Sequence, residues 1–304
     1  MRLLLVMNPG SRSGRGRRLW EGWERGLKSM GVDYSCARTE RVGHAFELAR
    51  GAQGVDAVVA VGGDGTINEV LDGVMQSGHP ALAMGVLYAG TSPDFCRFHG
   101  IPVDPAAALE ALLGREPEPV DVGRITYGLP EGGCRVAHFG CSCNIGMGAA
   151  IARRANARRR WLGDAVGTGT ALLQTMAEGA RVDAELELDG APLALRELNN
   201  ISVVKNPFLA SGLKLNLDVR HDDGSLWMVA IHGRSRTGML GLVPALYTGE
   251  ASAAPGVVAR RCRSITIRAR ERCEVEFDGD PRGLLPVSIE AVHRGLLLRG
   301  ARHG

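Results

Sequence analysis

The 304-residue sequence contains no stretch approaching the roughly 18 consecutive apolar residues of a membrane-spanning helix. It also has little net charge: 36 Lys and Arg stand against 33 Asp and Glu, giving +3, which does not indicate nucleic-acid binding. The first residues, Met1 to Asn8, have the pattern of a strand and not of a signal peptide. We therefore expect a cytoplasmic protein without a transmembrane segment and without a nucleic-acid partner.

Several well-known catalytic and phosphate-binding motifs are absent. The segment from Gly10 to Gly16 carries arginines but no lysine, so it is not a P-loop, and the segment starting at Gly146 lacks the last glycine of the dinucleotide pattern. No His-Glu-x-x-His helix and no Gly-x-Ser-x-Gly elbow occurs, which leaves zinc proteases and ester hydrolases without support.

The seven cysteines show no paired spacing, which is typical of a reducing compartment. Cys134, His138, Cys141 and Cys143 lie close enough in sequence to raise the question of a zinc site. Alternate residues of one strand face opposite ways, and this spacing is not a recognised metal pattern. We expect free thiols packed in a core. The length and the apolar fraction of 45% suit two folded domains.

The most informative segment runs from Asp56 to Val70, Asp-Ala-Val-Val-Ala-Val-Gly-Gly-Asp-Gly-Thr-Ile-Asn-Glu-Val. Its apolar run predicts a buried parallel strand that leads into a glycine turn. There we expect Gly62, Gly63 and Gly65 to permit positive φ and the close approach of a ligand to the main chain. Thr66 and Glu69 have capping-box spacing, so we expect a helix from Ile67. A helix N-terminus above a glycine turn favours phosphate. The alternative is a glycine-rich turn without a ligand.

Strands and helices alternate through the first third of the chain, which predicts an α/β domain with a parallel sheet flanked by helices. The ligand is then expected at the carboxyl ends of the strands. The expected strands are 3–7, 34–37, 57–61 and 83–87, and the expected helices are 17–30, 44–51, 67–77 and 105–113.

After Asp121 the pattern changes to alternating apolar and polar residues, which predicts a mainly antiparallel β-sandwich with inserted helices. Strands are expected at 181–188, 201–204, 213–219 and 264–268, with helices at 149–160 and 236–246. We therefore expect an α/β nucleotide-binding domain over residues 1–124 and a β-sandwich substrate domain over residues 125–289.

The ordered motifs of the chain resemble those of the diacylglycerol/sphingosine-type lipid kinases. Gly62 to Val70 resembles the lipid-kinase version of the Gly-Gly-Asp-Gly-Thr motif, which NAD kinases and phosphofructokinases share in its short form. The other matching segments are 8–14, Thr39 with 43–45, 90–97, 121–123, 144–148, 222–224 and 277–280. The resemblance implies an NAD-kinase/diacylglycerol-kinase-like fold. It also implies that residues from about 290 to 304 return to the first domain, and that the active site lies in a cleft between the domains.

The resemblance further implies an ATP- and Mg²⁺-dependent kinase that phosphorylates a hydroxyl of diacylglycerol or a related lipid, met at a membrane surface. Asp64 would hold metal or orient the nucleotide, and a helix-start turn is the alternative for it. The matching nucleotide-contact positions are Asn8, Thr39, Gly62, Gly63, Asp64, Gly65, Thr66, Gly90, Thr91 and Asp94.

The segment 277–280 resembles the family's Asp-Gly-Glu motif, so Asp278 is the expected general base. Asp280 stands where the family has glutamate, which shortens the side chain by about 1.5 Å. A plain Asp-Gly hairpin turn is the alternative. Pro93 stands where the family has asparagine; we expect Ser92 to cap a helix whose first residue is Pro93.

The segment 222–224 resembles the family's structural Mg²⁺ loop. The match places Asp223 and the backbone carbonyls of Arg220 and Ser225 around the ion, an all-oxygen set that Mg²⁺ prefers. The alternative is a simple Asp-Gly turn.

Five arginines between Arg153 and Arg160 form a basic cluster. It is interpreted either as a solvated helix face, which we favour, or as a patch for anionic headgroups at the inner membrane face. Two further hypotheses for function stay open: a non-catalytic or weakly active kinase homologue, motivated by Pro93 and Asp280, and an NAD kinase-like enzyme. A homodimer is neither indicated nor excluded.

Overall fold

The computed structural model describes residues 1–11, 16–146, 181–209, 213–270, 272–278 and 280–303. The chain divides into two compact units. Unit 1 holds residues 1–122 and 294–304, and unit 2 holds residues 123–293. The chain passes from one unit to the other within β5 (Glu118–Gly128) and again within β17 (Asp280–Leu298).

Unit 1 is built on a parallel sheet with the order β17-β4-β3-β1-β2. Its strands are β1 (Arg2–Met7), β2 (Asp33–Arg38), β3 (Ala57–Gly62), β4 (Ala83–Tyr88) and the end of β17. Its helices are α1 (Gly16–Ser29), α2 (His44–Arg50), α3 (Asp64–Met75), α4 (Asp94–Phe98) and α5 (Pro105–Gly114). The four strands and the four longer helices expected from the sequence are confirmed within a few residues.

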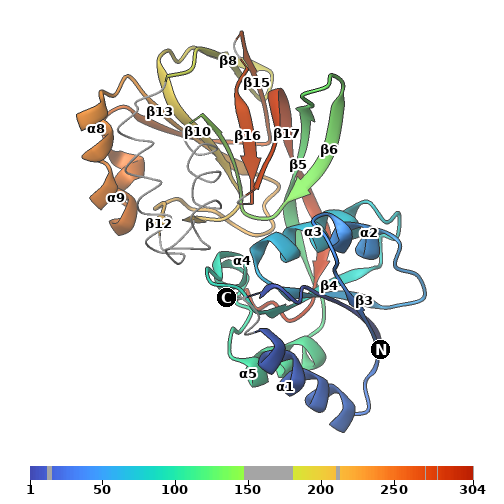
Figure 1. The fold of residues 1–304 in the computed structure, drawn as a ribbon. Coiled ribbons are helices and arrows are strands. Elements are labelled where there is room, and N and C mark those ends of the chain that lie inside the picture. The colour runs from blue at the N-terminus through green and yellow to red at the C-terminus, as the bar shows by residue number, and fades with distance from the viewer. Residues whose placement is uncertain (12–15, 147–180, 210–212, 271, 279, 304) are drawn as a thin grey trace. The chain divides into compact units, whose positions relative to one another are not determined.

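Helices cover both faces of this sheet (Figure 1). Trp23 and Leu27 of α1 and Leu109 of α5 pack on one face against alternate strand residues such as Leu5 and Val59. On the other face α2 packs against α3, and the two backbones approach so closely that a Cβ on Gly73 would lie 2.5 Å from the Phe46 carbonyl oxygen. Strands buried on both faces are expected to be continuously apolar, and all six residues of β3 and of β4 are buried.

Unit 2 is dominated by antiparallel pairing. Its main strand order is β14-β13-β10-β7-β16-β17. Off this path, β15 pairs with both β17 and β8, and β8 pairs with β9. A further antiparallel pair is formed by β5 and β6. These strands surround one apolar core that includes Phe139, Ile201, Met228, Ile265 and Phe277. The bounds are β6 Cys134–Phe139, β7 Ser142–Gly146, β8 Ala184–Leu188, β9 Ala191–Leu193, β10 Leu198–Val204, β13 Leu226–His232, β14 Val257–Cys262, β15 Ser264–Ala269 and β16 Glu274–Phe277.

Two expectations for unit 2 are wrong. The strand expected over 213–219 is only the two-residue β12 (Leu213–Lys214), paired with β11 (Phe208–Leu209). The helix expected over 236–246 is interrupted: α8 (Arg236–Leu240) ends at Gly241, and α9 (Val243–Thr248) begins afresh before the short 3-10 helix η3 (Glu250–Ala253). Pro244 in the first turn of α9 explains the restart, because proline suits a helix start and breaks an interior. The helix expected over 149–160, with its basic cluster, lies outside the described residues.

Candidate functional site

The loops expected to hold phosphate all leave the sheet of unit 1 at one edge. Met7 pairs with Val61, and Gly62 pairs with Tyr88, so β1, β3 and β4 end side by side. Backbone hydrogen bonds continue past the strand ends: Asn8 donates to the Val61 carbonyl at 3.0 Å, and Ala89 donates to the Gly62 carbonyl at 2.7 Å. The sheet therefore brings the Asn8, Gly62 and Gly90 loops to one edge.

The glycines of this edge are needed for space and not for positive φ, which corrects the expectation. Gly63 is extended, with φ −94° and ψ −170°, and Gly65 lies in the first turn of α3. A Cβ on Gly62 would lie 2.5 Å from the Thr66 Oγ1, and a Cβ on Gly90 would lie 2.7 Å from the Gly63 Cα. Two turns thus touch through bare backbone, where any side chain would separate them.

The capping box expected at Thr66 and Glu69 is also wrong. Helix α3 begins at Asp64, with Gly63 as its N-cap and no side-chain cap. The Thr66 Oγ1 instead accepts from the side-chain Nδ2 of Asn8 at 3.1 Å. The Glu69 carboxylate reaches a neighbouring helix and accepts from the Gly43 and Ala45 backbone N–H groups at 2.8 and 3.1 Å. Both side chains therefore join separate loops and do not close one helix end.

Asp64 occupies the first turn of α3, where the helix dipole stabilises a negative charge. Its Oδ2 lies 3.4 Å from the Tyr88 hydroxyl, which donates to it. Burial, reinforced by the Asp64 charge, raises the pKa of Tyr88 well above its ordinary value, so the phenol stays a proton donor. Nothing in the sequence pattern identified Tyr88, because it is the last residue of an apolar strand.

The segment that follows β4 carries the remaining expected nucleotide positions. Thr91 is exposed. Pro93 is the N-cap of α4, and Asp94 is its first residue, so the expected assignment is wrong by one position. The Ser92 hydroxyl donates to the Asp94 Oδ2 at 3.0 Å. Thr39 follows β2 and donates its backbone N–H to the Met7 carbonyl at 2.8 Å.

In unit 2, Asp278 lies at the turn between β16 and β17. Its φ of 48° is uncommon for a residue other than glycine. Its Oδ2 accepts from the Gly140 N–H at 2.8 Å, and its Oδ1 accepts from the Cys141 and Ser142 N–H groups at 2.9 and 3.0 Å. Burial raises the pKa of Asp278, although these three N–H groups and Arg282 oppose the rise. The carboxylate is therefore fixed in position and more basic than an exposed one.

The segment around Asp278 forms the hairpin turn that was the alternative expectation for it. Phe277 pairs with Asp280 across the ladder, which is the register of a two-residue hairpin. Asp278 thus forms a hairpin turn and at the same time folds its carboxylate back onto another loop. The backbone of Asp280 begins β17, and its side chain lies outside the described residues.

A buried polar row that the sequence pattern did not reveal crosses three strands near Asp278. The Asn144 amide of β7 donates to the Glu276 Oε2 of β16 at 2.6 Å, and the Ser202 hydroxyl of β10 donates to the Asn144 Oδ1 at 2.6 Å. Glu276 is 3% exposed. Two signals were available: Asn144 begins the matched segment 144–148, and Glu276 lies between the core residues Val275 and Phe277.

The expected metal loop brings its oxygens together around a side chain. The Arg220 and Ser225 carbonyl oxygens accept from the Lys205 Nζ at 2.6 and 3.0 Å. The Asp223 Oδ1 lies 3.5 Å from the same nitrogen. No cluster of three or more His, Cys, Asp or Glu suited to a metal occurs within the described residues. Lys205 belongs to none of the matched sequence motifs.

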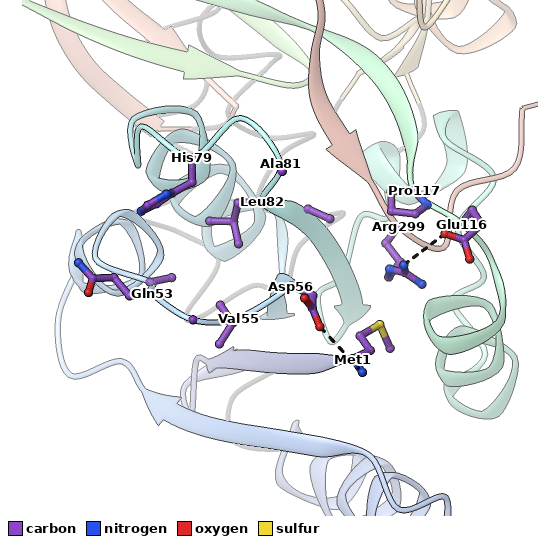
Figure 2. A pocket seen from close by; sticks show the side chains of 13 residues that line it. Met1, Gln53, Val55, Asp56, His79, Ala81, Leu82, Glu116, Pro117 and Arg299 are labelled. Carbon is purple, nitrogen blue, oxygen red and sulfur yellow. Dashed lines mark ion pairs between the residues drawn. The ribbon is translucent and has the colours of Figure 1, made fainter.

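A hollow of about 500 Å³ lies at the opposite edge of the unit 1 sheet (Figure 2). Most of its lining comes from residues that precede or begin β1, β3 and β4, together with Glu116, Pro117 and Arg299, whereas the glycine turn follows β3. Its charged groups pair with one another: the Met1 amino group lies 3.9 Å from Asp56, and Arg299 lies 3.7 Å from Glu116. We therefore assign it no part in the site.

Comparison with known sequences supports a single family along most of the chain. Residues 2–125 match the diacylglycerol kinase catalytic domain, and residues 141–298 match the YegS C-terminal NAD kinase beta sandwich-like domain. A diacylglycerol kinase of Mycobacterium tuberculosis is 28% identical over 98% of this chain and 95% of its own length. One from Staphylococcus aureus is 26% identical over 88% of this chain and 82% of its own.

Solved structures agree at the level of the fold. A putative diacylglycerol kinase from Bacillus anthracis has a TM-score of 0.77 at 21% identity, with 98% of this chain and 96% of that one covered. A yeast NADH kinase has a TM-score of 0.55 at 11% identity. The expected fold, an α/β domain with a parallel sheet and a β-sandwich domain, is confirmed. Within the described residues, no helix is long and apolar enough to cross a membrane. The chain belongs to the diacylglycerol kinase family and is a kinase, a phosphotransferase with an alcohol group as acceptor.

Proposed function

We propose that the protein is an ATP- and Mg²⁺-dependent lipid kinase that phosphorylates a hydroxyl of diacylglycerol or a related lipid. The observation that carries the proposal is the close approach of Gly63 and Gly90 at the carboxyl edge of the unit 1 sheet, beside the N-terminus of α3. Bare backbone beside a helix N-terminus is a general arrangement for binding phosphate. Family membership supports the use of ATP.

The triphosphate is assigned to this edge, with contacts from the ten positions that the family motifs match. Asn8 and Thr66 join two loops through their hydrogen bond, and Gly62 and Gly90 permit the close packing of the turns. Gly63, Gly65 and Thr91 are partly or fully exposed, and their backbone is proposed to contact the phosphates. Asp64 is proposed to hold the Mg²⁺ that accompanies the nucleotide, since phosphoryl transfer depends on metal and on positioning. Thr39 and Asp94 complete the assigned set.

Asp278 is proposed as the general base. As the lipid hydroxyl oxygen attacks the γ-phosphorus, the bond to the β–γ bridging oxygen breaks, ADP leaves, and the hydroxyl proton passes to the Asp278 carboxylate. Three backbone N–H groups hold that carboxylate in one orientation, and its raised pKa suits proton acceptance. Asp280 is proposed to assist at the position where relatives carry glutamate.

The decisive assay incubates the purified protein with labelled ATP, Mg²⁺ and mixed lipid micelles and resolves labelled lipids by mass spectrometry. Labelled diacylglycerol or a related lipid supports the proposal. Absence of label with any acceptor refutes it. The non-catalytic alternative holds if ATP stabilises the fold without turnover and the double substitution Pro93→Asn with Asp280→Glu restores phosphoryl transfer. Transfer of label to NAD would support the NAD kinase alternative.

The role of Asp278 has a matched control. Asp189 also precedes a glycine in a hairpin turn of unit 2, has a φ of 49°, and accepts from two backbone N–H groups at 2.8 Å. We expect Asp278→Asn to lower kcat by roughly 10² to 10⁴. Asp189→Asn removes the charge from a comparable turn while keeping the Oδ1 that accepts both N–H groups, and it should leave kcat unchanged. Equal effects of the two substitutions on kcat would assign Asp278 a structural role only.

We also propose that the enzyme meets its lipid at the membrane surface as a peripheral protein. Cosedimentation with vesicles of anionic and neutral lipid tests this, and charge reversal at Arg158 to Arg160 tests the basic cluster. Unchanged vesicle binding of that variant would eliminate the headgroup patch. Sedimentation velocity of the purified protein decides between a monomer and a homodimer.

A further inference from the structure

The motif resemblance predicts a structural Mg²⁺ at the Asp222-Asp223-Gly224 loop of unit 2, yet this chain supplies a cation of its own there. The three oxygen ligands expected for the ion are the Arg220 carbonyl, the Ser225 carbonyl and the Asp223 carboxylate. All three surround the Nζ atom of Lys205, at 2.6, 3.0 and 3.5 Å. An ammonium group has three N–H donors, which matches the three oxygens.

These distances are those of an ammonium group and not of a metal ion. Mg²⁺ requires oxygens at about 2.0–2.1 Å in an octahedral arrangement, and Ca²⁺ requires them at about 2.3–2.6 Å. The Lys205 side chain is 1% exposed, so it has been withdrawn from water. A buried charge is found in proteins where it is paired and hydrogen-bonded, as Lys205 is here.

The charge balance of the loop also opposes a divalent ion. The Asp223 Oδ2 accepts from the Arg261 Nη2 at 2.7 Å, and the Arg261 Nε donates to the Ser225 hydroxyl at 2.8 Å. One carboxylate therefore already faces two cationic side chains. A divalent ion on the same oxygens would meet the Lys205 ammonium in a partly buried region, where water screens repulsion poorly.

We infer that the Lys205 ammonium takes the place of the structural divalent cation, so that this loop is held without metal. The expected ligand set is thereby assigned a different occupant. The inference is independent of the catalytic proposal, because it concerns the nucleotide-free protein.

The first test uses the unaltered, nucleotide-free protein. Thermal unfolding is followed in EDTA and in 10 mM MgCl₂, and Mn²⁺ binding is followed by electron paramagnetic resonance. A metal present at 100 times its Kd would raise the midpoint by roughly 5 to 10 °C. We expect a shift below about 1 °C and no stoichiometric Mn²⁺ binding. A metal-dependent rise, or Mn²⁺ binding, that Asp223→Asn removes would overturn the inference.

The second test compares two substitutions of Lys205. Lys205→Ala removes the whole side chain and leaves the oxygens facing an open space, whereas Lys205→Met keeps the stem and removes only the charge. Both should lower the unfolding midpoint in EDTA by roughly 5 °C or more, because each leaves Asp223 without a buried partner. Mg²⁺ or Ca²⁺ should restore much of the loss in Lys205→Ala but not in Lys205→Met.

Two results of the second test contradict the inference. A Lys205→Met variant as stable as the unaltered protein would show that the ammonium does not hold the loop. A Lys205→Ala variant that no divalent ion rescues would show that the oxygens do not form a cation site. If neither variant folds, the metal titration of the unaltered protein still decides.

Discussion

The close approach of Gly63 and Gly90 gives the sharpest quantitative prediction. A Cβ on Gly90 would lie 2.7 Å from the Gly63 Cα and 2.6 Å from the Tyr88 hydroxyl. Ordinary contacts between such atoms are roughly 3.5 to 4.0 Å, so Gly90→Ala has to push the two turns apart by about 1 Å. Overpacking of this kind costs about 1 to 3 kcal/mol of unfolding free energy.

The same displacement should weaken nucleotide binding. A loss of about 1.4 kcal/mol in nucleotide contacts raises Kd tenfold, and misplacement by about 1 Å can lower kcat on the order of 10²-fold. Urea denaturation of the nucleotide-free variant measures the first effect, and calorimetric titration with ATP measures the second. The turnover assay on mixed micelles completes the set.

Gly22→Ala is the matched control. Gly22 lies in the exposed interior of α1 in the same unit, and a Cβ there would meet nothing within 4 Å. This substitution should stabilise the protein by about 1 kcal/mol, because alanine favours a helix interior over glycine. ATP binding should not change. A Gly90→Ala variant that keeps both stability and ATP affinity would refute the packing argument.

Two further predictions follow from named contacts. Glu69→Gln should cost about 1 to 2 kcal/mol, measured by urea denaturation, because the charge that accepts from the Gly43 and Ala45 N–H groups is lost; an unchanged midpoint contradicts the role of Glu69. Burial raises the pKa of Asp223, but the Ser225 hydrogen bonds and the Lys205 and Arg261 charges outweigh this effect and hold the pKa below its ordinary value. The stability that the Asp223 carboxylate contributes is therefore fully present above the unfolded-state pKa and declines as pH falls below it. The difference in unfolding midpoint between the unaltered protein and Asp223→Asn should shrink below about pH 4; a difference that grows there contradicts the pairing.

The sequence predicted most of unit 1 because its signals were local. Apolar runs such as Ala57 to Val61 are too short for helices and are bounded by turn residues, so strands and their order along the chain could be recognised. The ends of parallel strands meet at one edge of a sheet, and this rule predicted that the loops at Asn8, Gly62 and Gly90 lie together. Unit 2 was harder, since strands such as β7 and β16 are short and pair with partners far along the chain.

The local signals failed where a side chain forms hydrogen bonds with a loop far away in the sequence. Thr66 and Glu69 had the spacing of a capping box, but the first contacts Asn8, 58 residues earlier, and the second contacts the start of α2. Gly62 and Gly63 were expected to adopt unusual backbone angles, whereas the structure uses them for tight contact. Spacing alone does not distinguish these uses.

Lys205 shows the same limit at the candidate metal loop. The three expected ligands are identifiable from the motif, but the group that they surround lies 15 and 20 residues before two of them. A lysine after a strand is usually read as a solvated charge, since lysine is rarely buried. Only the folded chain shows that it is 1% exposed and bonded to backbone oxygens.

The division of unit 1 between both ends of the chain affects the order in which the protein can be assembled on the ribosome. Residues 294–304 emerge only after the whole of unit 2 has been synthesised, yet Leu297 and Leu298 pair with β4, and Arg299 donates to the Met84 carbonyl at 2.7 Å. Until then β4 is an uncovered edge strand, the kind of surface through which nascent chains aggregate. A premature stop near residue 293 would therefore damage unit 1, whose other residues were all translated long before.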